Sequence, residues 1–580
     1  MNQFKYIIFG CLLLTACAQA PNRPVAVQPV AEPEAQAVAP ESRAEPALAL
    51  PNIELSGELL YQFLLTEIAS QRGNIALAVQ GSSDLAIKTR DPRLAMRASQ
   101  LALQAGQLDK AIQALKVWRE VDPASPVAMR MYSSALLRSG RLAEAREELL
   151  GVLKAESASA GHIFYQIYQM LAPYPDKEAA LRLMLELAQP YPLVAEAHWS
   201  VAQLAQASGD QKLALNEASL ARSLRPEWDI AVSLEAFLLK RSAPQQGLEL
   251  LRRYLSDYPD SQDIRLQYAR TLLEQKQYKQ ARDEFQLLAD ENPENPETAF
   301  AIALISLQLK DYKGAEDQLK QALSKGKKDQ NTVRYYLGQL GEAKKSDDEA
   351  IEHYSQVKGG EYRFAAQIRV AYLMNKRGRL DEALQLLHQL QAEDVQQRVQ
   401  LISVEAQFLR EANRLSEAYQ VLQNGLGKQP NHPDLLYGAA MIADKLGKPD
   451  AFEQMMRKLI QIEPDHAHAY NALGYGLLER KERISEAVQL VEKALQLAPD
   501  DPAIMDSVGW GYYLTGKLDE SVKMLRRALD SSPDPEIAAH LGEVLWQRGD
   551  KAEAGKVWQD SLKANPDNAQ LQAVIKKFMP

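Results

Sequence analysis

A small residue recurs about every 34 residues through most of this 580-residue chain. Fourteen successive steps span 476 residues, every step is 33 to 35 residues long, and every position except Phe452 is Ala, Gly or Ser. The positions are Ala78, Ala111, Ala145, Ala180, Ala214, Gly247, Ala281, Ala315, Ala350, Ala383, Ala418, Phe452, Ala487, Ser521 and Ala554. A period of this size is typical of repeat arrays, which grow by adding units and need no single large core. The period therefore predicts a helical solenoid rather than several globular domains.

The clearest repeat covers residues 502–533 and shows what each position does. Its marker residues are Val508, Gly509, Tyr512, Gly516, Ser521, Leu525, Ala528 and Pro533. Small side chains at Gly509 and Ser521 allow two helices of one repeat to approach closely. Gly516 permits the turn between them, and Pro533 cannot continue the second helix.

This pattern resembles the tetratricopeptide repeat, in which small and large residues stand at the same offsets. The resemblance implies an all-α superhelical solenoid of about 15 helix pairs over residues 52–566. The first copy is degenerate, and Pro173 and Pro175 lengthen the turn in the fourth. Residues 567–580 are predicted to form a capping helix, because Leu571, Val574, Ile575 and Phe578 share one helical face.

The first residues of the chain are typical of a targeting signal rather than of a folded domain. Residues 1–16 contain Lys5 and a short apolar run, as in a secretory signal peptide. The sequence Leu14-Thr15-Ala16-Cys17 resembles the lipobox of bacterial lipoproteins. The resemblance implies that Cys17 is lipidated, and Ala18 in place of Asp implies an outer-membrane location with the body in the periplasm. The alternative is an ordinary signal peptide that is cut after an alanine.

Residues 17–51 are predicted to be a lipidated cysteine followed by a linker. Seven prolines interrupt this stretch: Pro21, Pro24, Pro29, Pro33, Pro40, Pro46 and Pro51. Such a composition cannot build a core and favours extended polyproline II chain, which would reach roughly 100 Å at about 3.1 Å per residue. The linker would therefore hold the array away from the lipid surface.

Composition argues against several classes of function. The net charge is −9 and no basic stripe is present, so we expect no nucleic-acid partner. The two cysteines, Cys11 and Cys17, precede the folded body, which excludes disulfides and cysteine-bound metals there. His466 and His468 are the one close histidine pair, and residues two apart on a helix point to different faces. We therefore favour a solvated loop over a metal site at this pair.

No catalytic motif stands out in the chain. The HExxH and G-x-S-x-G patterns and phosphate-binding glycine loops do not occur. We therefore expect a protein that is not an enzyme and holds no cofactor. The rival interpretation is an enzyme with polar groups clustered in a pocket.

Aromatic residues mark a candidate binding groove. In tetratricopeptide proteins the first helix of each pair lines the concave face. The matching positions here are Tyr437, Met441, Asn471, Tyr475, Trp510, Tyr513 and Trp546, and further back Trp199, Tyr335 and Tyr372. Exposed aromatic rings commonly anchor partner segments. The alternative is that these rings pack between repeats, as aromatic residues often do. The residue set that clamps a carboxylate in chaperone-binding relatives is not matched, since Asn471 alone resembles a member.

Lipobox, proline-rich linker and long repeat array together resemble the outer-membrane lipoprotein adaptors of the periplasmic carboxyl-terminal processing protease. That resemblance implies a scaffold, anchored in the membrane by lipid, whose partners are a protease and its peptidoglycan hydrolase substrates. Bringing both together raises their effective concentration. The rival binding function is an assembly factor for an exopolysaccharide or outer-membrane secretion system.

Overall fold

The computed structural model describes residues 50–579, and these form 31 α-helices, one short 3-10 helix (η2, Ser157–Ser159) and no strand. The predicted signal peptide, Cys17 and nearly all of the predicted linker lie outside the described residues. The array divides into two compact units, the first ending at Lys327 and the second beginning at Lys328. None of the described helices has the length and apolarity needed to cross a bilayer.

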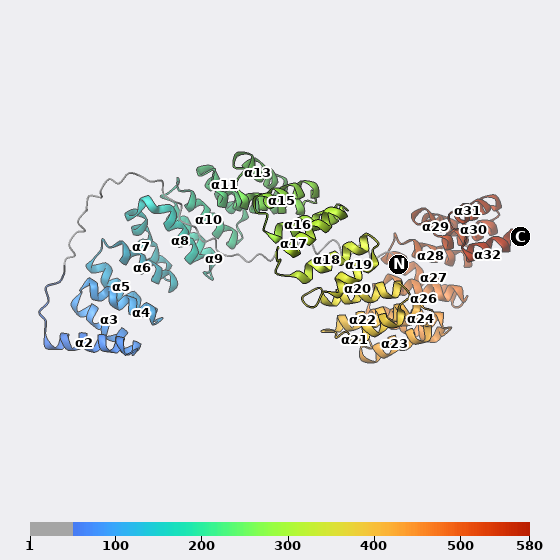
Figure 1. The fold of residues 1–580 in the computed structure, drawn as a ribbon, viewed down its shortest axis with the longest axis horizontal. Helices are drawn as coiled ribbons and strands as arrows, with labels where there is room; N and C mark the ends of the chain where they lie inside the picture. Colours follow the sequence, from blue (N-terminus) through green and yellow to red (C-terminus); the bar gives the residue numbers. More distant parts are fainter. Residues whose placement is uncertain (1–49, 580) are drawn as a thin grey trace. The chain divides into compact units, whose positions relative to one another are not determined.

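The first unit contains eight helix pairs that follow one another along the chain (Figure 1). Their bounds are α2 Gly57–Gln71, α3 Ile75–Thr89, α4 Pro92–Gln104, α5 Leu108–Val121, α6 Pro126–Arg138, α7 Leu142–Ala155, α8 Ala160–Leu171, α9 Lys177–Ala188, α10 Ala195–Ser208, α11 Gln211–Leu224, α12 Asp229–Ser242, α13 Pro244–Asp257, α14 Gln262–Glu274, α15 Tyr278–Glu291, α16 Pro296–Gln308 and α17 Tyr312–Ser324.

The second unit contains seven pairs and one last helix. Their bounds are α18 Gln330–Ala343, α19 Asp347–Ser355, α20 Arg363–Lys376, α21 Leu380–Gln389, α22 Val395–Glu411, α23 Leu415–Lys428, α24 Pro433–Lys445, α25 Pro449–Ile462, α26 Ala467–Glu479, α27 Ile484–Leu497, α28 Pro502–Leu514, α29 Leu518–Ser531, α30 Pro535–Arg548, α31 Lys551–Ala564 and α32 Ala569–Phe578. The two units together hold 15 pairs, so the predicted all-α repeat solenoid is confirmed.

The small residue of each repeat marks where the two helices of a pair cross most closely. In α28 and α29, the Ser521 hydroxyl is buried and donates to the Gly509 carbonyl oxygen at 2.7 Å. A Cβ atom on Gly509 would stand 2.5 Å from Cγ of the fully buried Leu525. Because that distance is far below a van der Waals contact, glycine is required here.

The exception at Phe452 is accommodated by its neighbour. Phe452 on α25 is almost fully buried, and its ring reaches Gly476 on α26, where a Cβ atom would lie 3.0 Å from the ring. The large side chain thus fills space that the glycine of the next repeat leaves open. Arg480, the C-cap residue of α26, covers the same ring at 5.7 Å.

Turns and helix starts follow from local chemistry. Gly516, between α28 and α29, has φ +82°, which places it in the left-handed region that favours glycine. Pro502 and Pro535 stand in the first turns of α28 and α30, where a missing N–H is harmless. The connection from α8 to α9 runs from residue 172 to 176 and contains Pro173 and Pro175, as the predicted longer turn requires.

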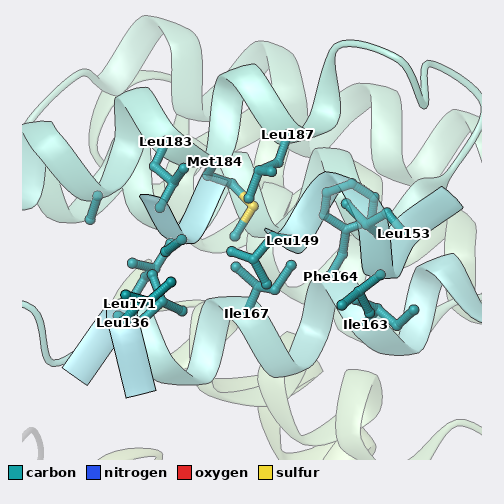
Figure 2. Packing of buried hydrophobic residues seen from close by; sticks show 14 of the residues in the cluster. Leu136, Leu149, Leu153, Ile163, Phe164, Ile167, Leu171, Leu183, Met184 and Leu187 are labelled. Carbon is teal, nitrogen blue, oxygen red and sulfur yellow. The ribbon is translucent and has the colours of Figure 1, made fainter. Parts of the chain in front are cut away.

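The hydrophobic core is formed by side chains from neighbouring helix pairs. Figure 2 shows this in the first unit, where side chains from four successive helices interdigitate. Leu136 comes from α6, Leu149 from α7, Phe164 from α8 and Met184 from α9, and all four are almost fully buried. Each repeat therefore depends on the next for burial of its apolar surface.

The two ends of the array differ. At the C-terminal end, α32 buries Leu571 completely and turns Gln570, Lys576 and Lys577 to solvent. At the other end, α2 exposes a row of large apolar side chains: Leu60, Tyr61, Phe63, Leu64, Leu65 and Ile68. An outer helix thus covers the last pair, whereas the first described helix leaves apolar surface open to solvent.

We predict that Gly509→Leu lowers the stability of the second unit by about 1–3 kcal/mol, because the new side chain collides with Leu525. Gly427→Leu is the matched control, since a Cβ atom there has nothing within 4 Å, and its effect should stay within about 0.5 kcal/mol. Urea unfolding followed by circular dichroism measures both. Equal losses in the two variants would contradict the role of Gly509.

Candidate binding surface on the inner helices

The predicted groove residues lie on the first helices of four successive pairs. Tyr437 and Met441 are on α24, Asn471 and Tyr475 on α26, Trp510 and Tyr513 on α28, and Trp546 on α30. All seven are half-buried. The first helices of neighbouring pairs also contact one another directly, α26 with α28 and α28 with α30. The five side chains on α26, α28 and α30 therefore belong to one continuous layer of the second unit.

Rings from three of these helices converge at one point. The Trp510 ring stacks on His540 of α30 with 4.3 Å between centroids. Tyr475 approaches the same imidazole at 6.4 Å, and Tyr513 lies 4.9 Å from Trp510. The structure thus brings Tyr475, Trp510 and Tyr513 together around a histidine that was not among the predicted site residues.

One hydrogen bond shows that this layer is the inside of a bend. The Tyr475 hydroxyl on α26 donates to Glu536 of α30 at 3.1 Å, so side chains two repeats apart meet across α28. Such a contact requires the first helices to converge on that side. We call the residues Tyr475, Glu479, Trp510, Glu536 and His540 the inner surface.

A buried ion pair between His540 and Asp506 lies beneath the inner surface. His540 and Asp506 are both more than nine-tenths buried, and His540 Nδ1 lies 2.9 Å from Asp506 Oδ1. Burial opposes the charged imidazole, but the hydrogen bond to Asp506 and the nearby Glu536 and Glu543 outweigh it. The pKa of His540 is therefore raised above its usual 6.5.

Negative charge gathers on the inner surface. The pKa of Glu479 is raised, first by desolvation and then by the carboxylates of Asp444 and Glu536. The positive charges of His540 and Arg480 lower the pKa of Glu479, but by less than burial and the two carboxylates raise it. The pKa of Tyr475 is raised for the same reasons, burial first and then the charge of Glu536. The surface therefore combines half-open rings with carboxylates that repel one another.

Other predicted residues have different neighbours. Tyr437 stacks on His466 with 5.6 Å between centroids. The His466 Nδ1 atom accepts a hydrogen bond from the Ala469 amide and caps α26. Asn471 carries a buried side-chain oxygen, Oδ1, that receives no hydrogen bond from the described residues. Within residues 50–579 no group of three or more metal-ligating side chains is assembled.

Trp546 belongs to the C-terminal cluster rather than to the converging rings. Its ring packs on Trp558 of α31 and on Phe578 of α32, each 5.9 Å away between centroids. Lys551 covers it at 5.1 Å. The contacts of Trp546 thus hold the last helix in place.

The three rings predicted further back behave differently from one another. Trp199 and Tyr335 are 5% and 6% exposed, so the packing alternative describes them. Trp199 sits among Tyr165, Tyr168 and Trp228. Tyr372 remains 36% exposed, with Arg369 over its ring at 5.0 Å.

Sequence reasoning missed the polar members of the inner surface. A signal was nevertheless present, because Asp506 and His540 are 34 residues apart and hold equivalent positions in successive repeats. Asp506 is also a charge within an otherwise apolar helix start. Buried polar residues one period apart predict a contact between neighbouring helices.

Comparison with known proteins places the chain in a family. Three sequence models described as tetratricopeptide repeat match it, the first at residues 102–162, 238–305 and 409–474, the second at 300–366 and 509–569, and the third at 467–501. TPR repeat-containing protein PA4667 of Pseudomonas aeruginosa is 33% identical over 546 residues, covering 94% of this chain and 90% of that protein. The chain is a tetratricopeptide repeat protein. Its repeats imply a scaffold for protein–protein interaction.

Other relatives share shorter stretches with this tetratricopeptide repeat protein. Cellulose synthase operon protein C of Pseudomonas fluorescens is 31% identical over 125 residues, which are 22% of this chain and 10% of that protein. Human protein O-mannosyl-transferase TMTC1 is 24% identical over 173 residues, 28% of this chain and 19% of that protein.

Among solved structures, similar chains include a tetratricopeptide repeat protein from Parabacteroides merdae, with a TM-score of 0.36 and 14% identity. That comparison covers 43% of this chain and 99% of the other. A second is TTC0263 of Thermus thermophilus, with a TM-score of 0.29 and 22% identity, covering 31% and 98%.

We predict that the His540–Asp506 pair stabilises the second unit in a pH-dependent way. Because the folded-state pKa of His540 is raised, its contribution is complete below pH 6.5 and is lost as the pH rises through the raised value. Thermal melting of the native protein and of His540→Gln between pH 6 and 9 measures this. The advantage of the native protein should shrink toward high pH, and a constant difference would contradict the prediction.

Proposed function

We propose that this protein is a lipid-anchored periplasmic scaffold that binds protein partners on the inner surface of its second unit. The observation that carries the proposal is the convergence of Tyr475 and Trp510 on His540, with both rings still half-open. Aromatic side chains that are already held by neighbours lose little freedom on binding, which suits them as anchors for a partner.

The anchor in this proposal is Cys17, supported by the sequence Leu14-Thr15-Ala16-Cys17. Several acyl chains on one residue meet the requirement of more than one lipid for stable attachment. The proline-rich segment after Cys17 would give the array a reach of roughly 100 Å from the outer membrane.

The partners we propose are a carboxyl-terminal processing protease and its peptidoglycan hydrolase substrates. Support comes from the combination of lipobox, linker and an array of 15 helix pairs. An array of this length offers separate surfaces for two partners, and joint binding would raise the local concentration of substrate at the protease. In this role the scaffold itself carries out no chemistry.

The second candidate function is an assembly factor for an exported polysaccharide. The match to cellulose synthase operon protein C favours it, although the match covers a tenth of that protein. Deletion of the gene separates the two candidates. Loss of surface polysaccharide with normal hydrolase levels would support the assembly factor, whereas accumulation of peptidoglycan hydrolases would support the protease adaptor.

We predict that Trp510→Ala weakens partner binding by about 2 kcal/mol, roughly 30-fold, because the ring is a central anchor. Trp546→Ala is the contrasting variant, since its ring packs on Trp558 and Phe578, and it should mainly lower the melting temperature. Affinity purification from native membranes with quantitative mass spectrometry measures partner recovery, and circular dichroism measures melting. Recovery of neither a protease nor a wall hydrolase by the native protein would contradict the adaptor role.

A further inference from the structure

The inner surface presents rings and carboxylates side by side. Tyr475 and Trp510 are half-buried, and Glu479 lies one helical turn beyond Tyr475 on α26. Glu536 is joined to the hydroxyl of Tyr475 at 3.1 Å. The faces of aromatic rings attract cations because of their quadrupole, most strongly where water is partly excluded.

The basic groups near these carboxylates already form ion pairs, although the Nη2 atom of Arg480 is buried without a hydrogen-bond partner. Arg480 pairs with Asp444 at 3.5 Å and with Glu482 at 3.4 Å. Lys577 pairs with Glu543 at 3.2 Å, and the His540 ring is bonded to Asp506. In residues 50–579 no ion pair within 4 Å is formed by Glu479, and Glu536 is held by the neutral hydroxyl of Tyr475. Among residues 50–579, Glu479 and Glu536 therefore have no ion-pair partner within 4 Å, and the nearby His540 and Arg480 only partly offset the repulsion at Glu479.

An unsatisfied acceptor lies on the same helix. The buried Oδ1 atom of Asn471, one turn before Tyr475 on α26, receives no hydrogen bond from any described group. A buried acceptor without a donor costs free energy until a donor is supplied. Lysine and arginine side chains bring several N–H donors, whereas a carboxylate brings none.

Together these features disfavour an acidic occupant and favour a basic one. An acidic peptide or an anionic lipid surface would add negative charge where carboxylates already repel each other. We propose that the inner surface of α26, α28 and α30 binds a lysine- or arginine-bearing segment of a protein partner, with the cation over Trp510 and Tyr475 and between Glu479 and Glu536. This inference rests on the proposed scaffold function and names the chemistry of its partner.

The test uses the full-length protein and two fluorescent nine-residue peptides, one alternating arginine with glycine and one alternating glutamate with glycine. Fluorescence anisotropy at low and physiological salt measures binding. We expect the arginine peptide to bind at least about tenfold more tightly than the glutamate peptide, and less tightly at higher salt because partly exposed charges are screened. Equal affinities, or no binding of the arginine peptide, would overturn the inference.

Charge-removing variants locate the effect on this surface. Glu479→Gln combined with Glu536→Gln keeps the side-chain shapes and should weaken the arginine peptide at least about tenfold. Glu520→Gln, on the exposed face of α29, is the matched control and should change binding less than about twofold. Melting curves show that the variants remain folded. Unchanged binding by the folded double variant would overturn the inference.

The outcome also separates this inference from the function on which it depends. If Trp510→Ala abolishes recovery of the native partners while the double glutamate variant leaves that recovery intact, the scaffold function stands and the basic segment is wrong. If neither change affects recovery, both proposals fail. If Trp510→Ala and the double glutamate variant each abolish recovery of the native partners, the scaffold function and the basic segment are both supported.

Discussion

The close crossing of two helices at a small residue is the contact on which the whole array depends. At Gly509 and Ser521 the helices approach so closely that a side-chain hydroxyl reaches the opposite backbone at 2.7 Å. Because a Cβ atom on Gly509 would collide with Leu525, any larger residue there strains the packing. A small residue recurs at this crossing about every 34 residues, and neighbouring pairs bury their apolar faces against each other.

Packing of this kind places the first helices of the second unit's last pairs on the inside of a bend. The bond from Tyr475 to Glu536 crosses a whole repeat, and it brings together residues 61 positions apart. The rings of Tyr475 and Trp510 are only half-buried there, since no further layer of residues 50–579 covers them. In the proposed function, this layer serves as the binding surface of the scaffold, and its chemical character comes from a few aromatic rings and carboxylates.

The fold could be predicted from the sequence because the same spacing of small residues recurs in successive repeats along the chain. The surroundings of the predicted groove residues could not be predicted in the same way, because Trp199, Trp510 and Trp546 hold related repeat positions but have different neighbours. Trp199 is enclosed by Tyr165, Tyr168 and Trp228, and Trp546 supports α32. Trp510 alone of these three stacks on a histidine at the inner surface. Contacts with neighbouring repeats determine whether such a ring is enclosed or half-open. These contacts cannot be read from the position of the residue within its own repeat.

The central claim is that partners bind on the inner side of α26, α28 and α30. Site-specific photo-crosslinking in living cells tests it most directly. A crosslinking amino acid replaces Tyr513, which is half-buried on α28 beside the retained Trp510, in one variant, and Lys523, which is exposed on α29, in another. The account predicts crosslinked partner protein from position 513 and none from position 523. Crosslinks from position 523 alone, or equal crosslinking from both, would contradict it.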